Sequence, residues 1–272
     1  MISSKRSEIS IIIPVFNEIR TIDAILRRVL EVADSHCLDS EIIVVDDGSS
    51  DGTRELLPSI CHDERIKLLF HPENRGKGAA IRTALGSATR ELVVIQDADL
   101  EYDPEQIDKL IEAMKNKNAD VVYGSRVLGA KEHLTVQRKN IYALGVFVLN
   151  LAVRCLYGLR LTDEATCYKL FRREDLNRMN LACERFEFCP EVTAKAARLG
   201  LVLVEVPITY HPRSIREGKK IGLKDAVIAF KTLWKFRKWL PDTTTNPKMS
   251  NCGTEAPQDE SKSDLICDKC AK

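Results

Sequence analysis

Three acidic side chains stand close together after a short apolar run and could hold a divalent metal ion. They are Asp97, Asp99 and Glu101, and they follow residues 92–95, which suit a buried strand. Alternate residues of an extended turn project to one side, so these carboxylates would form an all-oxygen nest for Mg²⁺ or Mn²⁺. The same acids are typical of a tight turn with a helix cap. The rest of the chain has to decide between the two interpretations.

Polar clusters follow the other expected strands as well. Apolar runs predict strands at residues 9–15, 41–45, 66–70, 92–95, 120–124 and 201–208. Helical patterns separate most of them, which predicts an α/β fold with a mostly parallel sheet flanked by helices on both faces. Ligands of such sheets bind beyond the carboxyl ends of the strands. We therefore expect one site at that edge, lined by Asn17, Glu18, Asp46, Asp47, Asn74, Arg75, Asp97, Asp99 and Arg126.

Two of these clusters have a second interpretation. Asp46 and Asp47 could accept the N–H groups of a nucleobase or hold a ribose, or they could only cap a turn. The sequence around Gly76 and Lys77 resembles a phosphate loop but lacks the G-x-x-x-x-G-K-[ST] spacing, which excludes a P-loop. Lys77 could still contact a nucleotide donor, or it could be a solvated lysine.

The composition describes a globular protein of balanced charge. The chain has 272 residues, 44% of them hydrophobic, and a formal net charge of +1, which suits one large domain or a domain with an appendage. A nucleic-acid binder would be expected to have a basic surplus, so that class is disfavoured. Nine cysteines without a paired spacing indicate reduced thiols and a cytosolic chain. We see no signal peptide, and the longest apolar tract, residues 143–153, is too short to span a bilayer.

Five motifs occur in an order that resembles family 2 glycosyltransferases. They are VDDGS (45–49), NRGKGAA (74–80), DADL (97–100), GSR (124–126) and TDEAT (162–166). Within that family the chain is similar to the polyprenyl-phosphate branch, which includes dolichyl-phosphate mannose synthase, from about residue 9 to residue 240. The resemblance implies a GT-A (Rossmann-like) fold, a nucleotide-diphosphate sugar donor such as GDP-mannose or UDP-glucose, a divalent metal (Mg²⁺ or Mn²⁺), and inversion at the anomeric carbon.

The resemblance also implies roles for single residues at positions that match the motifs. Those matched to the nucleotide sugar are Pro14, Glu18, Asp46, Asp47, Gly76, Lys77, Asp97 and Ala98. Those matched to the metal and the diphosphate are Asp97, Asp99 and Glu101. Those matched to catalysis, near the transferred sugar and the acceptor, are Arg126, Arg138, Asp163 and Lys220. One departure is Cys167, which stands where many relatives have glycine.

The charges indicate how such a transfer would work. The leaving nucleoside diphosphate gains negative charge, which a metal at the acidic cluster would offset. A polyprenyl phosphate acceptor is already an anion, so it needs cations such as Arg126, Arg138 and Lys220 rather than a general base. A sugar or protein hydroxyl as acceptor would instead need Asp163 as the base. A catalytically silent subunit that only binds the nucleotide sugar is the third alternative.

The chain divides into a catalytic domain and a tail. We assign residues 1–125 to a nucleotide-sugar-binding half and residues 126–240 to an acceptor half, with a disordered tail at 241–272 because few apolar residues occur there. Residues 137–157 and 223–240 predict helices, the second amphipathic and basic with tryptophans, which either lie on a membrane surface or pack as core. We expect a peripheral protein at the cytoplasmic face of a membrane, alone or with a membrane-protein partner.

Overall fold

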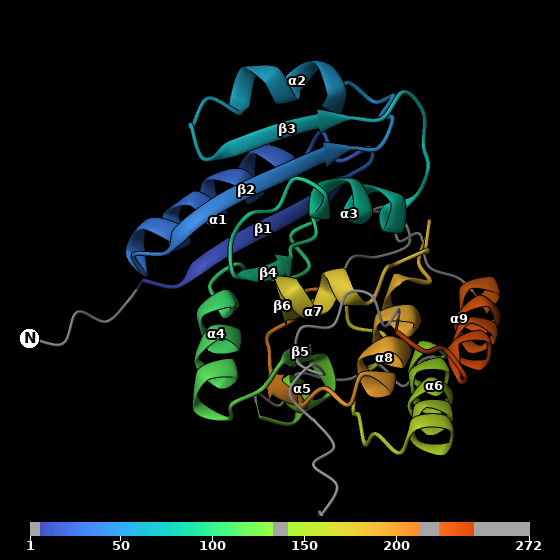
Figure 1. Ribbon diagram of the computed structural model, residues 1–272. Helices are drawn as coiled ribbons and strands as arrows, with labels where there is room; N and C mark the ends of the chain where they lie inside the picture. The colour runs from blue at the N-terminus through green and yellow to red at the C-terminus, as the bar shows by residue number, and fades with distance from the viewer. Residues whose placement is uncertain (1–5, 133–140, 213–222, 242–272) are drawn as a thin grey trace, which may run out of the picture. The chain divides into compact units, whose positions relative to one another are not determined.

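A seven-stranded sheet forms the centre of the computed structural model, which describes residues 6–132, 141–212 and 223–241 (Figure 1). The strand order across the sheet is β3-β2-β1-β4-β6-β5-β7. The strands are β1 (Glu8–Val15), β2 (Asp39–Asp46), β3 (Ile66–Phe70), β4 (Leu92–Ile95), β5 (Val121–Ser125), β6 (Lys169–Arg172) and β7 (Leu203–Pro207). The helices are α1 (Ile22–Ser35), α2 (Thr53–Ile60), α3 (Lys77–Leu85), α4 (Gln106–Asn116), α5 (Arg126–Glu132), α6 (Ile141–Tyr157), α7 (Arg173–Arg178), α8 (Phe188–Arg198) and α9 (Leu223–Phe236).

Strand direction decides which loops share an edge of the sheet. β3, β2, β1 and β4 pair in parallel, as do β5 and β7, so their carboxyl ends meet at one edge. β6 lies between β4 and β5 and runs antiparallel to both. Its amino end therefore reaches the edge where the parallel strands end. The loop that precedes β6 is thereby brought to the site, although it comes from the second half of the chain.

Helices cover the two faces of the sheet because the strands are apolar on both sides. The odd-numbered isoleucines of β1 pack with α1, α2 and α4, whereas Ile12 of the same strand packs with α3, α7 and α8. Both sets are almost fully buried. Such continuous apolar strands are typical of parallel sheets that are covered on both faces. The fold is therefore a three-layer α/β arrangement, as the sequence predicts.

A third apolar cluster joins the long helices of the second half. Leu149 and Val153 of α6, Leu233 and Phe236 of α9 and Ala194 of α8 pack in one cluster. These helices lie side by side in Figure 1, on the side of α8. Both helices thus bury one face, and their other face remains available to solvent or to a partner.

The expected strands all form, within one or two residues of their predicted limits. β6 is additional to the predicted strands. The helix predicted at 137–157 is described from Ile141, and the one predicted at 223–240 ends at Phe236. The tail expected at 241–272 lies outside the described residues except for Pro241.

Candidate functional site

The carboxylate of Asp47 fixes the loop between β3 and α3. It accepts the main-chain N–H groups of Arg75 at 3.0 Å and Gly76 at 2.7 Å, and it lies 2.7 Å from Nδ1 of His71. Asp47 is 2% exposed, so these charge-assisted contacts are shielded from water. The side chain therefore shapes the loop that carries Lys77, rather than standing open to a ligand.

Asp46 acts in the same way on the loop after β2. Its carboxylate accepts hydrogen bonds from the main-chain N–H of Ser49 at 3.3 Å and from Nη1 of Arg54 at 3.1 Å. Gly48 between them has φ +74, and an added Cβ would lie 2.5 Å from the main chain of Glu73. Only glycine fits this close approach of two loops. The two acids predicted to hold the nucleoside thus both bind groups of the loops at this edge of the sheet.

The acidic cluster after β4 is spread over several partners. Asp97 forms an ion pair with Lys77, and Asp99 accepts the N–H of Glu101 at 3.1 Å. The carboxylate of Glu101 accepts the hydroxyl of Tyr210 at 2.6 Å. Across the three described ranges, no three His, Cys, Asp or Glu side chains are grouped so that they could hold a metal ion. The nest of three carboxylates that the sequence predicts is not preformed in this structure.

Lys77 is held at the first of these acids. Burial would lower the pKa of its ammonium group, but the charge of Asp97 and the hydrogen bond to it raise that pKa well above its usual value. Lys77 is therefore a cation in the site, and the alternative of a solvated lysine does not apply because its side chain is 15% exposed.

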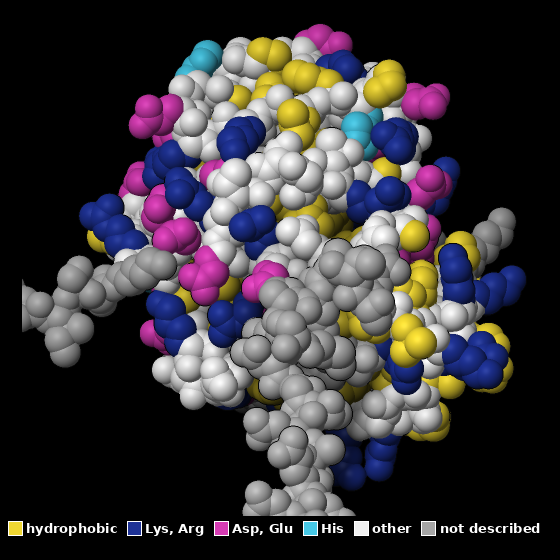
Figure 2. All heavy atoms as spheres, in the orientation of Figure 1, with side chains coloured by type: hydrophobic (Ala, Val, Ile, Leu, Met, Phe, Trp, Pro, Cys, Tyr) yellow, Lys and Arg dark blue, Asp and Glu magenta, His cyan; other side chains and the backbone are white. Residues whose placement is uncertain are grey.

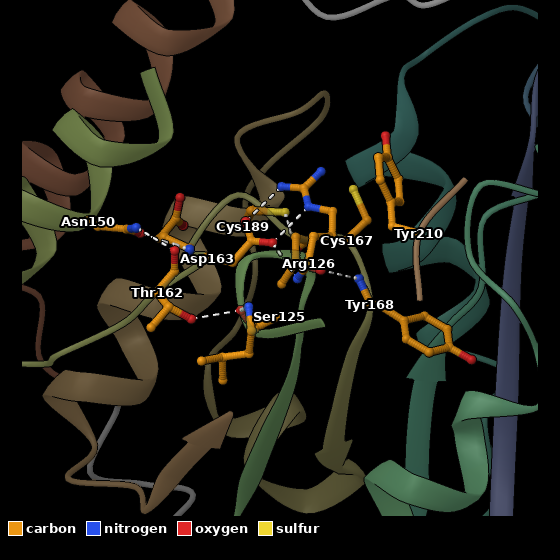
Figure 3. Close-up of polar contacts among 12 residues, drawn as sticks. Ser125, Arg126, Asn150, Thr162, Asp163, Cys167, Tyr168, Cys189 and Tyr210 are labelled. Carbon is orange, nitrogen blue, oxygen red and sulfur yellow. Dashed lines mark hydrogen bonds and ion pairs between the residues drawn. The ribbon is translucent and has the colours of Figure 1, made fainter. Parts of the chain in front are cut away.

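Arg126 and Asp163 form the central ion pair of the second half (Figure 3). Nε and Nη2 of Arg126 donate to the two carboxylate oxygens of Asp163, each at 2.7 Å, and the main-chain N–H of Arg126 adds a third bond at 2.9 Å. Asp163 is 1% exposed. Burial alone would lower the pKa of Arg126, but Tyr102 and Asp163 raise it well above its usual value. Arg126 is therefore a cation at neutral pH, and three hydrogen bonds join it to Asp163.

Three further side chains at this site, Tyr210, Tyr102 and Glu205, belong to no sequence motif that predicts them. The ring of Tyr210 lies under the Arg126 guanidinium at 5.2 Å, while its hydroxyl donates to Glu101. Tyr102 stacks on Tyr168 with ring centroids 5.3 Å apart. Glu205 of β7 accepts the N–H groups of Thr162 at 2.8 Å and of the next residue at 3.0 Å. A tyrosine or a glutamate at a strand end has many ordinary uses, so neither stands out without the fold.

Cys167 lies next to the ion pair of Arg126 and Asp163 in Figure 3. Its N–H donates to the hydroxyl oxygen of Tyr102 at 3.3 Å. A hydrogen bond with the thiol of Cys189 lowers the pKa of Cys167, and the nearby charge of Lys77 acts in the same direction. The position that departs from many relatives thus lies between the Lys77 and Arg126 parts of the site.

Of the remaining predicted residues, three lie in the described part of the chain and two lie outside it. Pro14 lies on β1 opposite Val45 of β2, close to the carboxyl edge. Glu18 caps α1 with its main-chain oxygen, and its carboxylate accepts the hydroxyl of Thr21 at 3.0 Å. Ala98 is buried in the core beneath the acidic turn. Arg138 and Lys220 lie outside the described residues.

An apolar surface with basic side chains covers the exposed face of α6 and α9. We call it the α6/α9 surface and define it by Leu144, Phe147, Val148, Leu151, Val227, Ile228, Phe230 and Trp234, whose exposed fractions run from 43% to 63%. Exposed basic residues on and beside it are Arg154, Lys231, Lys235 and Lys238. Figure 2 shows hydrophobic and basic side chains side by side where these helices lie. Among the helices that the structure describes, none is long and apolar enough to cross a bilayer.

Comparisons with known proteins agree with one another. Residues 10–179 match the model of glycosyl transferase family 2. The undecaprenyl-phosphate mannosyltransferase of Micrococcus luteus is 32% identical over 220 residues, covering 78% of this chain and 86% of that protein. The dolichyl-phosphate beta-glucosyltransferase of Trichomonas vaginalis is 32% identical over 75% of this chain, which spans only 65% of that protein's length.

A solved structure supports the fold. The glucosyl-3-phosphoglycerate synthase of Mycobacterium tuberculosis, solved with Mn²⁺, uridine diphosphate and phosphoglyceric acid, superposes with a TM-score of 0.64. The match covers 88% of this chain and 81% of that one at 20% identity. The predicted GT-A architecture, a mostly parallel sheet flanked by helices, is confirmed, and the sheet has seven strands of which β6 is antiparallel to its neighbours.

Proposed function

The chain belongs to glycosyltransferase family 2, and from that premise we propose that it transfers a hexose with inversion from a nucleotide-diphosphate sugar to a polyprenyl phosphate. The reaction would use a divalent metal ion and take place at the cytoplasmic face of a membrane. GDP-mannose and UDP-glucose are the candidate donors, because one relative is named a mannosyltransferase and the other a glucosyltransferase. Both of these relatives are named for a polyprenyl-phosphate substrate, which supports that acceptor.

The ion pair between Arg126 and Asp163 is the observation that carries the choice of acceptor. A general base must accept a proton from the acceptor hydroxyl, so it needs a free lone pair within reach. Three N–H donors of Arg126 bind the carboxylate of Asp163, and the side chain is 1% exposed, so an acceptor hydroxyl has little access to the lone pair that is left. A phosphate acceptor needs no base, and it does need a fixed cation. The pair therefore favours a phosphate over the hydroxyl alternative.

Asp163 then has a positioning role. The guanidinium lies between the Asp163 carboxylate on one side and the ring of Tyr210 on the other, which together favour one orientation (Figure 3). A cation that needs no rearrangement when charge develops stabilises a transition state more than a mobile one. Arg126 would thus bind the acceptor phosphate or the sugar next to it.

The acidic turn fits a metal ion that takes most of its ligands from the donor. Mg²⁺ is usually held by one or two carboxylates together with substrate phosphates and water, and this turn supplies Asp97 and Asp99 at a sheet edge. The Mn²⁺ and uridine diphosphate of the solved neighbour support such an ion. When bound, the ion offsets the negative charge of the leaving diphosphate. Lys77, already beside Asp97, would face the same phosphates.

The α6/α9 surface fits contact with a lipid membrane. Apolar side chains with lysines around them lie well at the boundary between acyl chains and anionic headgroups. Trp234 and Phe147 are 51% and 63% exposed, which is unusual for large side chains unless another surface covers them. A polyprenyl phosphate has its chain in the bilayer, so an enzyme that uses it has to approach the membrane. A membrane-protein partner on the same surface is the other possible means of attachment.

The test is transfer of radiolabelled sugar into an organic-extractable fraction. Purified protein is incubated with Mg²⁺ or Mn²⁺, a short polyprenyl phosphate, and each of the two candidate donors. We expect label in the organic phase with one donor, and its loss with EDTA and in Asp97→Asn. Absence of label with both donors, in a protein that still binds nucleotide, would contradict the proposal and favour the silent subunit.

Membrane contact is tested separately with anionic vesicles in a sedimentation assay. Phe147→Glu is expected to weaken the binding, because it places a charge in the α6/α9 surface. Val202→Glu is the matched control, since Val202 is 50% exposed but lies outside that surface. Equal vesicle binding by the wild type and Phe147→Glu would contradict a membrane role for α6.

A further inference from the structure

Asn150 of α6 holds the main chain on both sides of Asp163. Its Nδ2 donates to the carbonyl oxygen of Thr162 at 2.7 Å, and its Oδ1 accepts the N–H of Glu164 at 2.9 Å. Figure 3 shows the side chain reaching from the helix to this loop. Asparagine is an uncommon choice in the middle of an otherwise apolar helical run, because its polar group has to find partners there. Here one amide finds a donor and an acceptor in the same loop.

Glu205 of β7 also binds the main chain of the loop that carries Asp163. Glu205 accepts the N–H groups of Thr162 and Asp163, so two side chains bind four main-chain groups within three consecutive residues. The hydroxyl of Thr162 also lies 2.7 Å from the hydroxyl of Ser125. With its main chain fixed in this way, Asp163 can meet all three donors of Arg126 at hydrogen-bonding distance. The orientation of the ion pair thus depends on how the loop is held.

We propose that Asn150 is a positioning residue for the transfer reaction, acting through the Asp163 loop on Arg126. The inference rests on the proposed function, and it names a residue that touches no substrate. Loss of the amide would leave one main-chain donor and one acceptor without their partner, and the loop could then shift. A displacement of about 1 Å at a reacting group can reduce a rate by about 10²-fold.

The position of Asn150 also connects two parts of the molecule. The same helix carries Leu144, Phe147, Val148 and Leu151 of the α6/α9 surface. The two hydrogen bonds are therefore a direct link between the surface proposed to meet the membrane and the loop proposed to orient the cation. Asn150 would transmit a displacement of α6 to the loop by hydrogen bonds, in addition to the apolar contacts of Leu161 and Ala165 with the cluster that contains α6.

Three variants test the role with kcat and the KM of the donor. Asn150→Ala removes both hydrogen bonds, and we expect kcat to fall about 10-fold to 10²-fold with the donor KM nearly unchanged. Tyr157→Phe is the matched control, because its hydroxyl joins the same helix to the main chain of Leu233 in α9 at 2.5 Å, away from the loop. This control should keep the wild-type kcat.

The pH dependence of kcat in Asn150→Asp distinguishes hydrogen bonding by this residue from a general packing role. Its ionised carboxylate can still accept the N–H of Glu164 but repels the carbonyl oxygen of Thr162, whereas its protonated form can donate to that oxygen. The ratio of its kcat to the wild-type kcat should therefore rise as the pH falls towards the ordinary pKa of an aspartate, about 3.9. A ratio that does not change with pH would overturn the proposal.

Amide hydrogen exchange of residues 158–168 separates this inference from the proposed function. In Asn150→Ala the exchange should be faster in that segment, while Tyr157→Phe should leave it unchanged. Faster exchange with an unaltered kcat would overturn the positioning role. Should the wild type transfer no sugar to a lipid phosphate, the proposed function fails, and exchange in this segment still decides whether Asn150 holds the loop.

Discussion

Replacing Asp163 with asparagine should reduce both activity and stability, because it removes the charge that compensates Arg126. The amide has one acceptor oxygen in place of two, so at most two of the three N–H donors of Arg126 keep a partner. The amide nitrogen would then face a guanidinium N–H group. Removal of one member of a buried pair usually costs about 3–5 kcal/mol. Arg126 is 22% exposed, so water relieves part of that cost and we expect about 3 kcal/mol.

The loss of activity should exceed what the loss of stability explains. An Arg126 guanidinium that is no longer fixed would be a weaker electrostatic partner for the acceptor phosphate, and the expected decrease in kcat is about 10²-fold to 10³-fold. Urea unfolding measures the change in the free energy of unfolding. Initial rates of label transfer, measured well below the unfolding midpoint, measure the change in kcat. Asp163→Asn with a kcat within about twofold of wild type would refute the role assigned to the pair.

Glu41→Gln is the control for this experiment. Glu41 is also a buried carboxylate with a cationic partner, Lys67 at 2.6 Å, and with further bonds from Ser10 and Thr89. It lies near the amino end of β2, at the opposite edge of the sheet from the site. We expect a comparable loss of stability and a wild-type kcat. An equal loss of kcat in both variants would indicate that activity follows global stability alone.

Three further predictions concern single side chains. Burial raises the pKa of Glu41, but hydrogen bonds outweigh burial and lower this pKa from 4.5 to about 2. The carboxylate therefore contributes fully to stability above pH 4.5, and this contribution is lost as the pH falls towards 2. Unfolding free energies measured across that range should therefore depend less on pH in Glu41→Gln. Tyr210→Phe should raise the metal concentration for half-maximal activity about 10-fold, because Glu101 loses its hydroxyl donor, whereas Tyr210→Leu should also lower kcat through the lost ring beneath Arg126. Gly76→Ala should cost about 2 kcal/mol or more and raise the donor KM, since φ is +100 and a methyl group meets the segment before α8, while Gly145→Ala has open space and should do neither.

The sequence predicts the parallel strands and their shared edge because these follow from local pattern. β1 and β2 are continuous apolar runs that end in polar residues, and nothing in the tertiary structure opposes that preference. β6 was missed for a physical reason. It has four residues, begins with Lys169 and ends with Arg172, and Lys169 is buried only because its ammonium lies 3.3 Å from the centre of the Tyr123 ring and bonds to a carbonyl oxygen. That environment exists only in the folded chain.

The position of the candidate site could be predicted from the sequence, but the pairings of its residues could not. The structure places Asp97 after β4 and Arg126 after β5, with Asp163 bound to Arg126. Their roles in the reaction stay predictions. The partner of Glu101 is Tyr210, which is 109 residues away, and the partner of Asp97 is Lys77. Spacing within a turn predicted that the carboxylates converge on one another. The long-range partners spread them instead, and such partners cannot be read from local spacing.

The antiparallel strand β6 has a consequence for the size of the site. Neighbouring strands lie about 4.8 Å apart, so inserting β6 between β4 and β5 moves the ends of those two strands to about 10 Å from each other. The acidic turn with Asp97 follows β4, and Arg126 follows β5. A gap of about 10 Å is of the order of a diphosphate with one sugar ring, which is the group that the proposed reaction has to place between a metal ion and an acceptor cation. Without β6, the ends of β4 and β5 would lie about 4.8 Å apart, which is too close for such a group to fit between them. The loop that leads into β6 carries Asp163, which binds that cation, so this antiparallel strand separates the two charged parts of the site and its preceding loop orients one of them.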